Sequence, residues 1–166
     1  MKYREVFERF DIFDVLNDEE RKMIGGVFVK RLYKAKDVIY DETDNGGALY
    51  LLIKGRVNIC RRTKDSTMLP YATIGEGEIF GLVSFIDGAK HSATAIADDA
   101  LVDVLIIQRE DFEWLLLETP VLTAKVYKQL GMHLCRIARY LSSQYMDLSD
   151  ICCQMTGAIT QQVSDK

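Results

Sequence analysis

The feature that most constrains the fold is a series of short β-prone runs between Lys30 and Ile107. The runs are VIYDE, ALYLLIKG, RVNICRR, MLPYATIGEGEIF, SATAIA and ALVDVLIIQR. Turn-forming residues separate them, among them the stretch DNGG at 44–47 and the pair Lys54–Gly55. Strands at such even spacing are typical of an antiparallel barrel or sandwich, so we predict a mainly β unit of about eight strands.

Residues 3–29, before the strands, have a helical pattern. Aromatic and aliphatic residues recur at three-residue spacing from Phe7 to Leu16. Asn17, followed three residues later by Glu20, forms a capping-box pattern that predicts the start of a second helix. Two consecutive glycines, 25 and 26, are expected to loosen the middle of that helix.

Helical patterns return after the strands. Residues 109–117 predict a short helix that ends before Pro120, because the residue before a proline is pushed out of the α region. A long helix is expected from 121 to 155. Its apolar residues step alternately by three and four, up to Met155, which is an a/d heptad pattern.

A heptad seam this narrow usually packs on a partner helix, and its spacing predicts a left-handed supercoil. We therefore predict a homodimer formed through the C-terminal helix. The alternative is a helix that lies on its own β unit. Gln144, the one polar seam residue, would meet its symmetry mate and could fix the register. The predicted dimer interface is Tyr127, Leu130, Leu134, Ile137, Leu141, Gln144, Leu148 and Ile151.

The expected organisation is a β unit with its flanking helices at 1–120, the heptad helix at 121–155 and a tail at 156–166. A chain of 166 residues is long enough for one domain with its own core and an additional helix. The net charge of −4 and the charged fraction of 28% are those of an ordinary globular protein. They do not suggest the basic surface that duplex DNA requires.

Charge is scattered through the N-terminal residues, which therefore do not form the apolar centre of a signal peptide. The longest apolar runs, such as 48–53, are too short to span a bilayer. We expect a cytoplasmic protein without membrane association. There are four cysteines, no Cys-x-x-Cys and only two histidines, so no metal site is expected. The adjacent Cys152 and Cys153 leave a redox role open.

Several motifs follow one another in an order that resembles the cyclic-nucleotide-binding domain. LYLLIKGRVNI (49–59) resembles that family's strand–turn–strand Y-x-I-x-x-G-x-V, and IGEGEIFG (74–81) resembles its turn into the phosphate-binding cassette. HSATAIADDALVDVLIIQREDFEWLL (91–116) resembles the strands and short helix that follow. IARYL (137–141) resembles the dimer helix of the bacterial catabolite-activator branch.

This resemblance covers residues 7 to 145. It implies an α+β, mainly β fold: an antiparallel, jelly-roll-like β-roll with N-terminal helices and a long C-terminal dimerisation helix. In the family the cassette reads approximately F-G-E, an apolar turn, then R-S/T-A. The glutamate accepts from the ribose 2′-hydroxyl, the arginine neutralises the cyclic phosphate, and backbone N–H groups complete the cradle.

This sequence departs from the cassette pattern at both charged positions. Leu82 follows Phe80–Gly81 in place of the glutamate, and His91 stands where the arginine is expected. The turn is also one residue shorter, which leaves Lys90 as another group that could face the pocket. Two residues fall where the catabolite-activator branch contacts the base, Gln144 and Tyr145. The candidate ligand-binding residues are Gly81, Leu82, Val83, Ser84, His91, Ser92, Ala93, Gln144 and Tyr145.

Loss of the two charged groups predicts weak binding. A charge-assisted contact contributes about 1.5–3 kcal/mol. Losing two weakens binding roughly a hundredfold to ten-thousandfold. With an ordinary pKa of about 6.5, His91 is mostly neutral at pH 7 and would replace the arginine only in mild acid. The backbone cradle at 82–84 and the hydroxyls of Ser84 and Ser92 could remain. The plainer interpretation of His91 is a structural strand histidine.

Two hypotheses for function follow. The first is a non-catalytic, homodimeric regulatory or signalling module that binds ordinary cyclic AMP and cyclic GMP weakly or not at all and acts on a protein partner. The alternative is a small-molecule sensor that binds a cyclic nucleotide or cyclic dinucleotide with altered specificity. A cyclic nucleotide is the one ligand that the resemblance suggests, and no cofactor is expected.

Three further classes are disfavoured. A transcription factor of the catabolite-activator or fumarate-nitrate type has a winged helix-turn-helix after the dimer helix, and TGAITQQVSDK (156–166) has no recognition-helix pattern. Binding to DNA is therefore not expected. An enzyme is not expected either, since no nucleophile lies at a recognisable spacing from a base. A haem sensor using His91 or Cys60 would be coloured, so a visible spectrum would decide that case.

Overall fold

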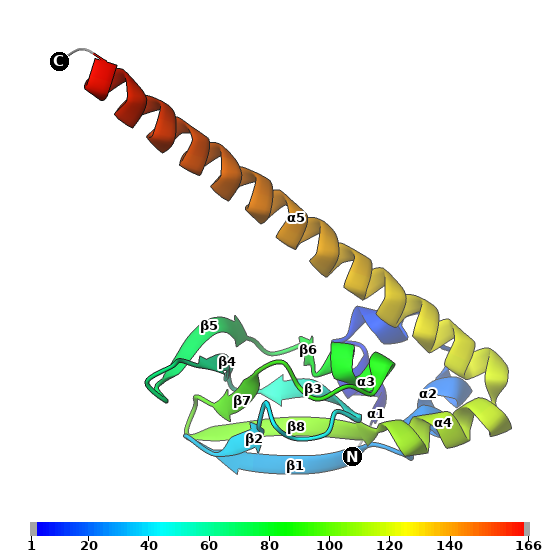
Figure 1. The fold of residues 1–166 in the computed structure, drawn as a ribbon. Coiled ribbons are helices and arrows are strands. Elements are labelled where there is room, and N and C mark those ends of the chain that lie inside the picture. Colours follow the sequence, from blue (N-terminus) through cyan, green and yellow to red (C-terminus); the bar gives the residue numbers. More distant parts are fainter. Residues whose placement is uncertain (1–2, 165–166) are drawn as a thin grey trace. The chain divides into compact units, whose positions relative to one another are not determined.

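The computed structural model describes residues 3–164, and their side chains from 5 to 151. The chain divides into two compact units, Met1–Gln129 and Leu130–Lys166. All the strands in the described residues belong to the first unit (Figure 1). The second unit contains the greater part of one long helix.

The first unit is an antiparallel β-roll of two four-stranded sheets. One sheet has the order β1-β8-β3-β6 and the other β2-β7-β4-β5, and the sheets face each other (Figure 1). The prediction of a mainly β roll of about eight strands is confirmed. The strands are β1 (Val29–Lys34), β2 (Val38–Tyr40), β3 (Ala48–Lys54), β4 (Val57–Arg62), β5 (Met68–Ile74), β6 (Ile79–Phe80), β7 (Thr94–Ala97) and β8 (Leu101–Gln108).

The turn predicted at Lys54–Gly55 carries the chain from one sheet to the other. Gly55 has a φ of 94°, in the left-handed region that favours glycine. A Cβ at this position would lie 2.9 Å from the carbonyl oxygen of Leu101. Both the backbone conformation and the close approach of β8 therefore require glycine here.

The core lies between the sheets, where alternate residues of each strand point inward. On β8 these are Val102, Val104 and Ile106, which belong to one buried cluster with Ala95 of β7 and with residues of β3 and β4. The intervening residues Leu105 and Ile107 are buried as well. Strand β8 is therefore covered on both faces, which explains its near-continuous apolar sequence.

The N-terminal segment is less regular than predicted. Helix α1 (Tyr3–Phe7) is short and is followed by a 3₁₀ turn, η1 (Asp11–Phe13). The amide of Phe10 donates to the carbonyl of Phe7, and the amide of Phe13 donates to that of Phe10. The three-residue spacing of these phenylalanines matches the 3.0 residues per turn of 3₁₀ geometry, so the expectation of one continuous helix was wrong.

The capping box predicted at Asn17 is confirmed. Asn17 Oδ1 accepts from the amide of Glu20 at 2.9 Å, and Glu20 Oε2 accepts from the amide of Asn17 at 3.0 Å. Helix α2 (Asp18–Gly25) begins there and ends at its first glycine, with Gly26 as the C-cap. The two glycines therefore stand at the end of this helix and not in its middle, because glycine is a poor helix former.

Two helices follow the strands, α4 (Arg109–Glu118) and α5 (Pro120–Ser164). The single residue between them, Thr119, has a φ of −138° and a ψ of 64°, as expected before a proline. The short helix is thus confirmed, while the long one continues beyond its predicted end at 155. The side chains of Cys152, Cys153 and Met155 lie outside the described residues, so the redox and seam predictions for them stay predictions.

Candidate functional site

The site begins as a glycine-bounded loop between β6 and β7. Gly81 (φ 75°) precedes the short helix α3 (Leu82–Asp87), and Gly88 (φ 71°) ends it. A Cβ at Gly81 would lie 2.7 Å from the ring of Tyr50 and 2.9 Å from the carbonyl oxygen of Ala48. The loop thus has a glycine at each end of its short helix, and its shape depends on close packing against β3.

A second loop, between β2 and β3, closes directly onto the first. The amide of Gly46 donates to the carbonyl of Ala89 at 3.1 Å, and the amide of His91 donates to the carbonyl of Asp44 at 3.3 Å. A Cβ on Gly46 would overlap the Ala89 carbonyl oxygen and the Cβ of Ser84. The stretch DNGG, which the sequence marked only as a turn, therefore forms one wall of the site.

His91 is buried at the end of the cassette loop. Its Nδ1 lies 2.8 Å from the hydroxyl oxygen of Ser84. Its ring stacks on that of Tyr40, with centroids 3.8 Å apart and planes 12° apart. Burial lowers the pKa of His91 below its ordinary value of 6.5, and the nearby carboxylate of Asp44 opposes this shift more weakly. The imidazole is therefore neutral at pH 7 and needs stronger acid for protonation than the sequence suggested.

Aromatic rings fill the interior beside His91. The rings of Tyr50 and Phe80 stack with centroids 4.9 Å apart, and Tyr40 lies 5.2 Å from Tyr50. Burial raises the pKa of the Tyr50 phenol to about 12, and it also raises that of Tyr40. Both phenols stay protonated at neutral pH. This lining offers aromatic surface and neutral hydrogen-bonding groups, but no positive charge.

The other candidate ligand-binding residues of the loop differ in whether their side chains are buried or exposed. Leu82 and Ala93 are buried apolar side chains, whereas Val83 and Ser92 are exposed. Lys90, the other candidate cation, is also exposed. Of the predicted residues of the first unit, the structure brings together Ser84 and His91 and does not bring the side chains of Val83 and Ser92 to them.

Two arginines lie near the loops, and sequence reasoning assigned neither of them to the site. The guanidinium of Arg109 lies so close to Gly88 that a Cβ there would overlap it, and its Nε donates to Glu113 at 2.7 Å. Arg62 of β4 lies 3.3 Å from Asp41 and 3.5 Å from Glu42. Carboxylates therefore engage both guanidiniums. Arg109 lies far along the chain from Gly81, and only the folded topology brings its guanidinium to Gly88.

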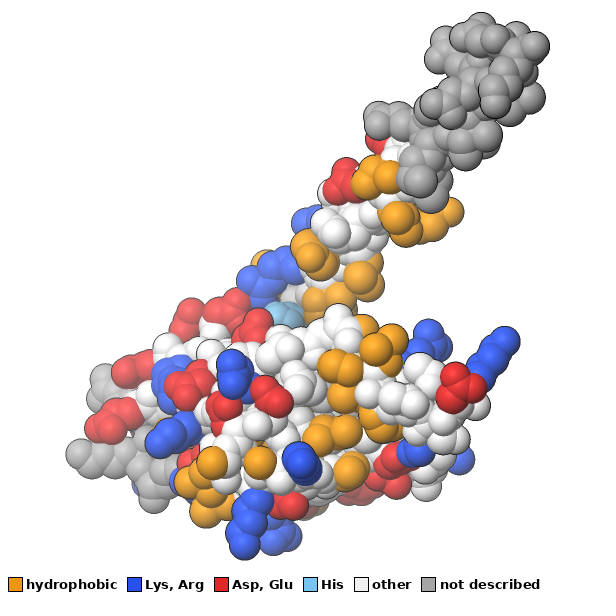
Figure 2. All heavy atoms as spheres, turned by 90° about the vertical axis from the view of Figure 1, so that its left-hand side faces the viewer, with side chains coloured by type: hydrophobic (Ala, Val, Ile, Leu, Met, Phe, Trp, Pro, Cys, Tyr) orange, Lys and Arg blue, Asp and Glu red, His pale blue; other side chains and the backbone are white. Residues whose placement is uncertain are grey.

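The heptad seam of α5 changes character along its length. At its start Tyr127 packs edge-on against Phe112, with centroids 5.0 Å apart, and Leu130 is buried. Leu134 is half-buried. From Ile137 onward the seam is exposed, including Leu141, Gln144, Leu148 and Ile151, and Figure 2 shows hydrophobic side chains along this helix. Tyr145, the other candidate base contact, is also exposed on the second unit.

The chain belongs to the cyclic nucleotide-binding domain family, whose model matches residues 30–119. It is 31% identical over 123 residues to the cyclic AMP receptor protein of Thermus thermophilus, covering 74% of this chain and 56% of that protein. It is 32% identical over 88 residues to a Dictyostelium discoideum cAMP-dependent protein kinase regulatory subunit, covering 52% of this chain and 26% of that protein. The chain thus spans about half or less of the length of these relatives.

Solved structures agree with this assignment. A cyclic nucleotide-binding domain from Methylobacillus flagellatus superposes with a TM-score of 0.74 at 26% identity, covering 83% of this chain and 79% of that one. The catabolite activator protein of Thermus thermophilus superposes with a TM-score of 0.71 at 31% identity, covering 83% and 62%. The predicted fold class and family are therefore confirmed.

None of the described helices is both long enough and apolar enough to cross a bilayer. The same part of the chain has no group of three or more histidine, cysteine, aspartate or glutamate side chains placed to hold a metal ion.

Proposed function

We propose that this member of the cyclic nucleotide-binding family is a non-catalytic regulatory module that binds ordinary cyclic AMP and cyclic GMP weakly or not at all. The observation that carries the proposal is the state of His91. It occupies the position of the family's arginine, yet it is buried, neutral, stacked on Tyr40 and paired with Ser84. A cyclic phosphate at this place would meet no cation.

The neighbouring charges reinforce this reasoning. Asp44 lies close enough to act electrostatically on His91, and a carboxylate beside the loop disfavours an anion. Any phosphate that recruited Arg109 or Arg62 would have to compete with Glu113, or with Asp41 and Glu42. Leu82, at the glutamate position, is buried and offers the ribose no acceptor.

Isothermal titration calorimetry tests the proposal. The wild-type chain is expected to give no binding heat with cyclic AMP or cyclic GMP, at nucleotide concentrations that would saturate a cassette with both charged residues. The double variant Leu82→Glu/His91→Arg restores the cassette charges and is expected to gain affinity by about a hundredfold or more, from two charge-assisted contacts. Circular dichroism confirms that the variant is folded. Tight binding of cyclic AMP or cyclic GMP by the wild type would refute the proposal.

A sensor of altered specificity is the second candidate function. The position of Arg109 against Gly88 favours it, since a bulkier or more highly charged ligand could displace Glu113 and reach that guanidinium. Cyclic dinucleotides are the first probes. Saturable binding that Arg109→Gln abolishes would support the sensor. The matched control is Arg56→Gln, in the turn between β3 and β4, whose guanidinium pairs with Asp98 and Asp99.

The module is also proposed to be a homodimer through α5. The exposed seam from Ile137 to Ile151 supports this, because such apolar side chains are usually covered. Charged residues Lys128, Arg136 and Arg139 fall at outer heptad positions b, c and f, so they would not oppose one another across the seam. Sedimentation equilibrium is expected to give a dimer, and Ile137→Asp/Leu141→Asp a monomer. A monomeric wild type would refute the dimer.

A further inference from the structure

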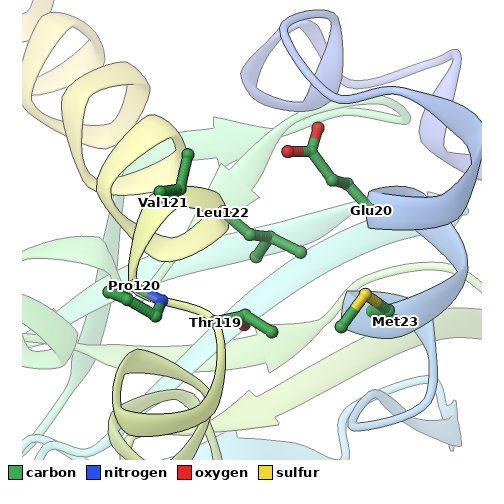
Figure 3. A pocket seen from close by; sticks show the side chains of 6 residues that line it. All are labelled: Glu20, Met23, Thr119, Pro120, Val121 and Leu122. Carbon is green, nitrogen blue, oxygen red and sulfur yellow. The ribbon is translucent and has the colours of Figure 1, made fainter.

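A groove separates α2 from the junction of α4 and α5, all within the first unit. Its volume is about 280 Å³. Glu20 and Met23 line it from α2, and Thr119, Pro120, Val121 and Leu122 line it from the junction. Figure 3 shows Met23 extending from α2 toward Thr119, and Leu122 extending from α5 toward α2.

The walls of this groove are fixed by specific contacts. Lys125 Nζ lies 2.6 Å from Glu20 Oε1, which ties the first turns of α5 to α2. The hydroxyl of Thr119 donates to the carbonyl of Leu115 at 2.9 Å, which anchors the residue between the two helices. Leu122 is buried and forms the floor. These contacts join the two walls of the groove within the first unit.

Large apolar side chains face solvent in the lining of the groove, at Met23 and Val121, and on the adjoining helix α4, at Trp114 and Leu117. The exposed fractions are 47% for Met23, 69% for Val121, 81% for Leu117 and 57% for Trp114. Trp114 and Leu117 are three residues apart, so they share one face of α4. Its other face carries the buried Phe112 and Leu115. Exposed apolar side chains gathered in this way indicate a binding surface.

The helices that form the groove carry a net negative charge. Helix α2 (18–25) and residues 109–125 together hold seven acidic and four basic residues, a net charge of −3 out of −4 for the whole chain. Two of those bases, Lys125 and Arg109, are engaged by Glu20 and Glu113. The carboxylates of Glu19, Glu110 and Glu118 are exposed. We call these exposed carboxylates the acidic surround of the groove; Glu19 and Glu118 are next in sequence to the lining residues Glu20 and Thr119.

We propose that this groove docks a cationic amphipathic helix of a partner protein. The apolar face of that helix lies against Met23, Leu117 and Val121, and its lysines or arginines face Glu19, Glu110 and Glu118. An amphipathic helix in an apolar groove is a recurrent mode of peptide recognition, and opposite charge around the groove sets the partner and the orientation. The inference rests on the proposed regulatory role, because it names the class of partner on which the module acts.

The charge also discriminates against other occupants. A second copy that paired through the same face would bring two acidic surrounds together, and like charges across an interface disfavour association. Nucleic acid and anionic lipid are disfavoured for the same reason. The cationic helix is the occupant that satisfies both the apolar groove and its surround.

Trp114, the only tryptophan of the chain, reports on this surface. The full chain is titrated with a synthetic peptide of about 16 residues in which leucine and lysine repeat with the helical period and no aromatic residue occurs. The expected result is a saturable blue shift of Trp114 emission that weakens as salt shortens the Debye length below about 8 Å. A peptide with glutamate in place of lysine is expected to give no shift.

Variants localise the binding. Met23→Ser/Val121→Ser, which changes only exposed side chains, is expected to weaken binding about tenfold or more. Glu19→Gln/Glu118→Gln is expected to weaken it and to reduce its salt dependence. The matched control Val38→Ser/Leu69→Ser removes two exposed apolar side chains from the sheet β2-β7-β4-β5. It is expected to have no effect on peptide binding.

Three outcomes overturn the proposal: equal binding by the groove variants and the wild type, equal binding of the glutamate peptide, or a blue shift that rises with protein concentration without any peptide. The last would mean that a second copy covers this face. Nucleotide binding is measured separately by calorimetry, so failure of this proposal and failure of the proposed function are distinguishable.

Discussion

Gly46 is the residue whose substitution most directly tests how the two loops of the site fit together. Its amide donates to Ala89, and its α-carbon lies against Ser84 of α3. In Gly46→Ala, the new methyl group would overlap the Ala89 carbonyl oxygen and the Cβ of Ser84. One of these is a backbone atom, so the overlap cannot be relieved by turning a flexible side chain. The loop between β2 and β3 must lift.

The cost can be estimated from the contacts. Overpacking at a closely packed position costs about 1–3 kcal/mol. A loop that lifts to avoid it loses the bonds from Gly46 to Ala89 and from His91 to Asp44, at about 1 kcal/mol each. Either route predicts that the free energy of unfolding falls by about 1–3 kcal/mol. At about 2–4 °C per kcal/mol for a chain of this size, the melting midpoint falls by roughly 2–12 °C.

Differential scanning calorimetry measures this loss, and Gly131→Ala is the matched control. No atom lies within 4 Å of a Cβ at Gly131, which is in the interior of α5. Alanine there is expected to stabilise by about 0.5–1 kcal/mol, because glycine is unfavourable in a helix. The two substitutions should therefore change the free energy of unfolding in opposite directions. A Gly46→Ala variant as stable as the wild type would refute the description of the closed loop.

Two further predictions concern stability and pH. Because the folded-state pKa of His91 lies below 6.5, its neutral form stabilises the fold fully above that pH, and this stabilisation is lost as pH falls from 6.5 through the folded-state pKa. In urea unfolding, the wild type should lose more stability between pH 7.5 and 5.5 than His91→Gln; parallel losses would contradict the burial of a neutral imidazole. Glu20→Ala removes the capping box with Asn17 and the ion pair with Lys125, so it should cost about 1–2 kcal/mol. Glu19→Ala should change stability by no more than about 0.5 kcal/mol, and similar effects of the two would count against the capping box.

Much of the fold follows from local patterns. The glycine-separated strands predicted the β-roll, and Asn17 with Glu20 predicted the start of α2, because both signals act over a few residues. The spacing of Phe7, Phe10 and Phe13 was read as a helix, although it fits 3₁₀ turns better. In a short segment, a three-residue spacing does not distinguish an α-helix from 3₁₀ turns.

The site was only partly predictable. The loop that begins at Gly81 was recognised from its resemblance to the family's cassette, and the assignment of Leu82 and His91 to the positions of the family's charged residues stays a prediction. The approach of Gly46 and Arg109 could not, since it depends on contacts between segments far apart in the sequence. Likewise the lowered pKa of His91 arises from burial, which one strand's sequence does not reveal.

Ligand-dependent thermal stability tests the central claim most directly. The wild-type chain is melted with and without millimolar cyclic AMP, cyclic GMP and cyclic dinucleotides, at pH 7.5 and pH 6. A ligand present at about a hundred times its Kd adds about 2.7 kcal/mol, which would raise the midpoint by roughly 5–10 °C. The proposed function predicts no rise with cyclic AMP or cyclic GMP at either pH. A rise of that size with either nucleotide would contradict it.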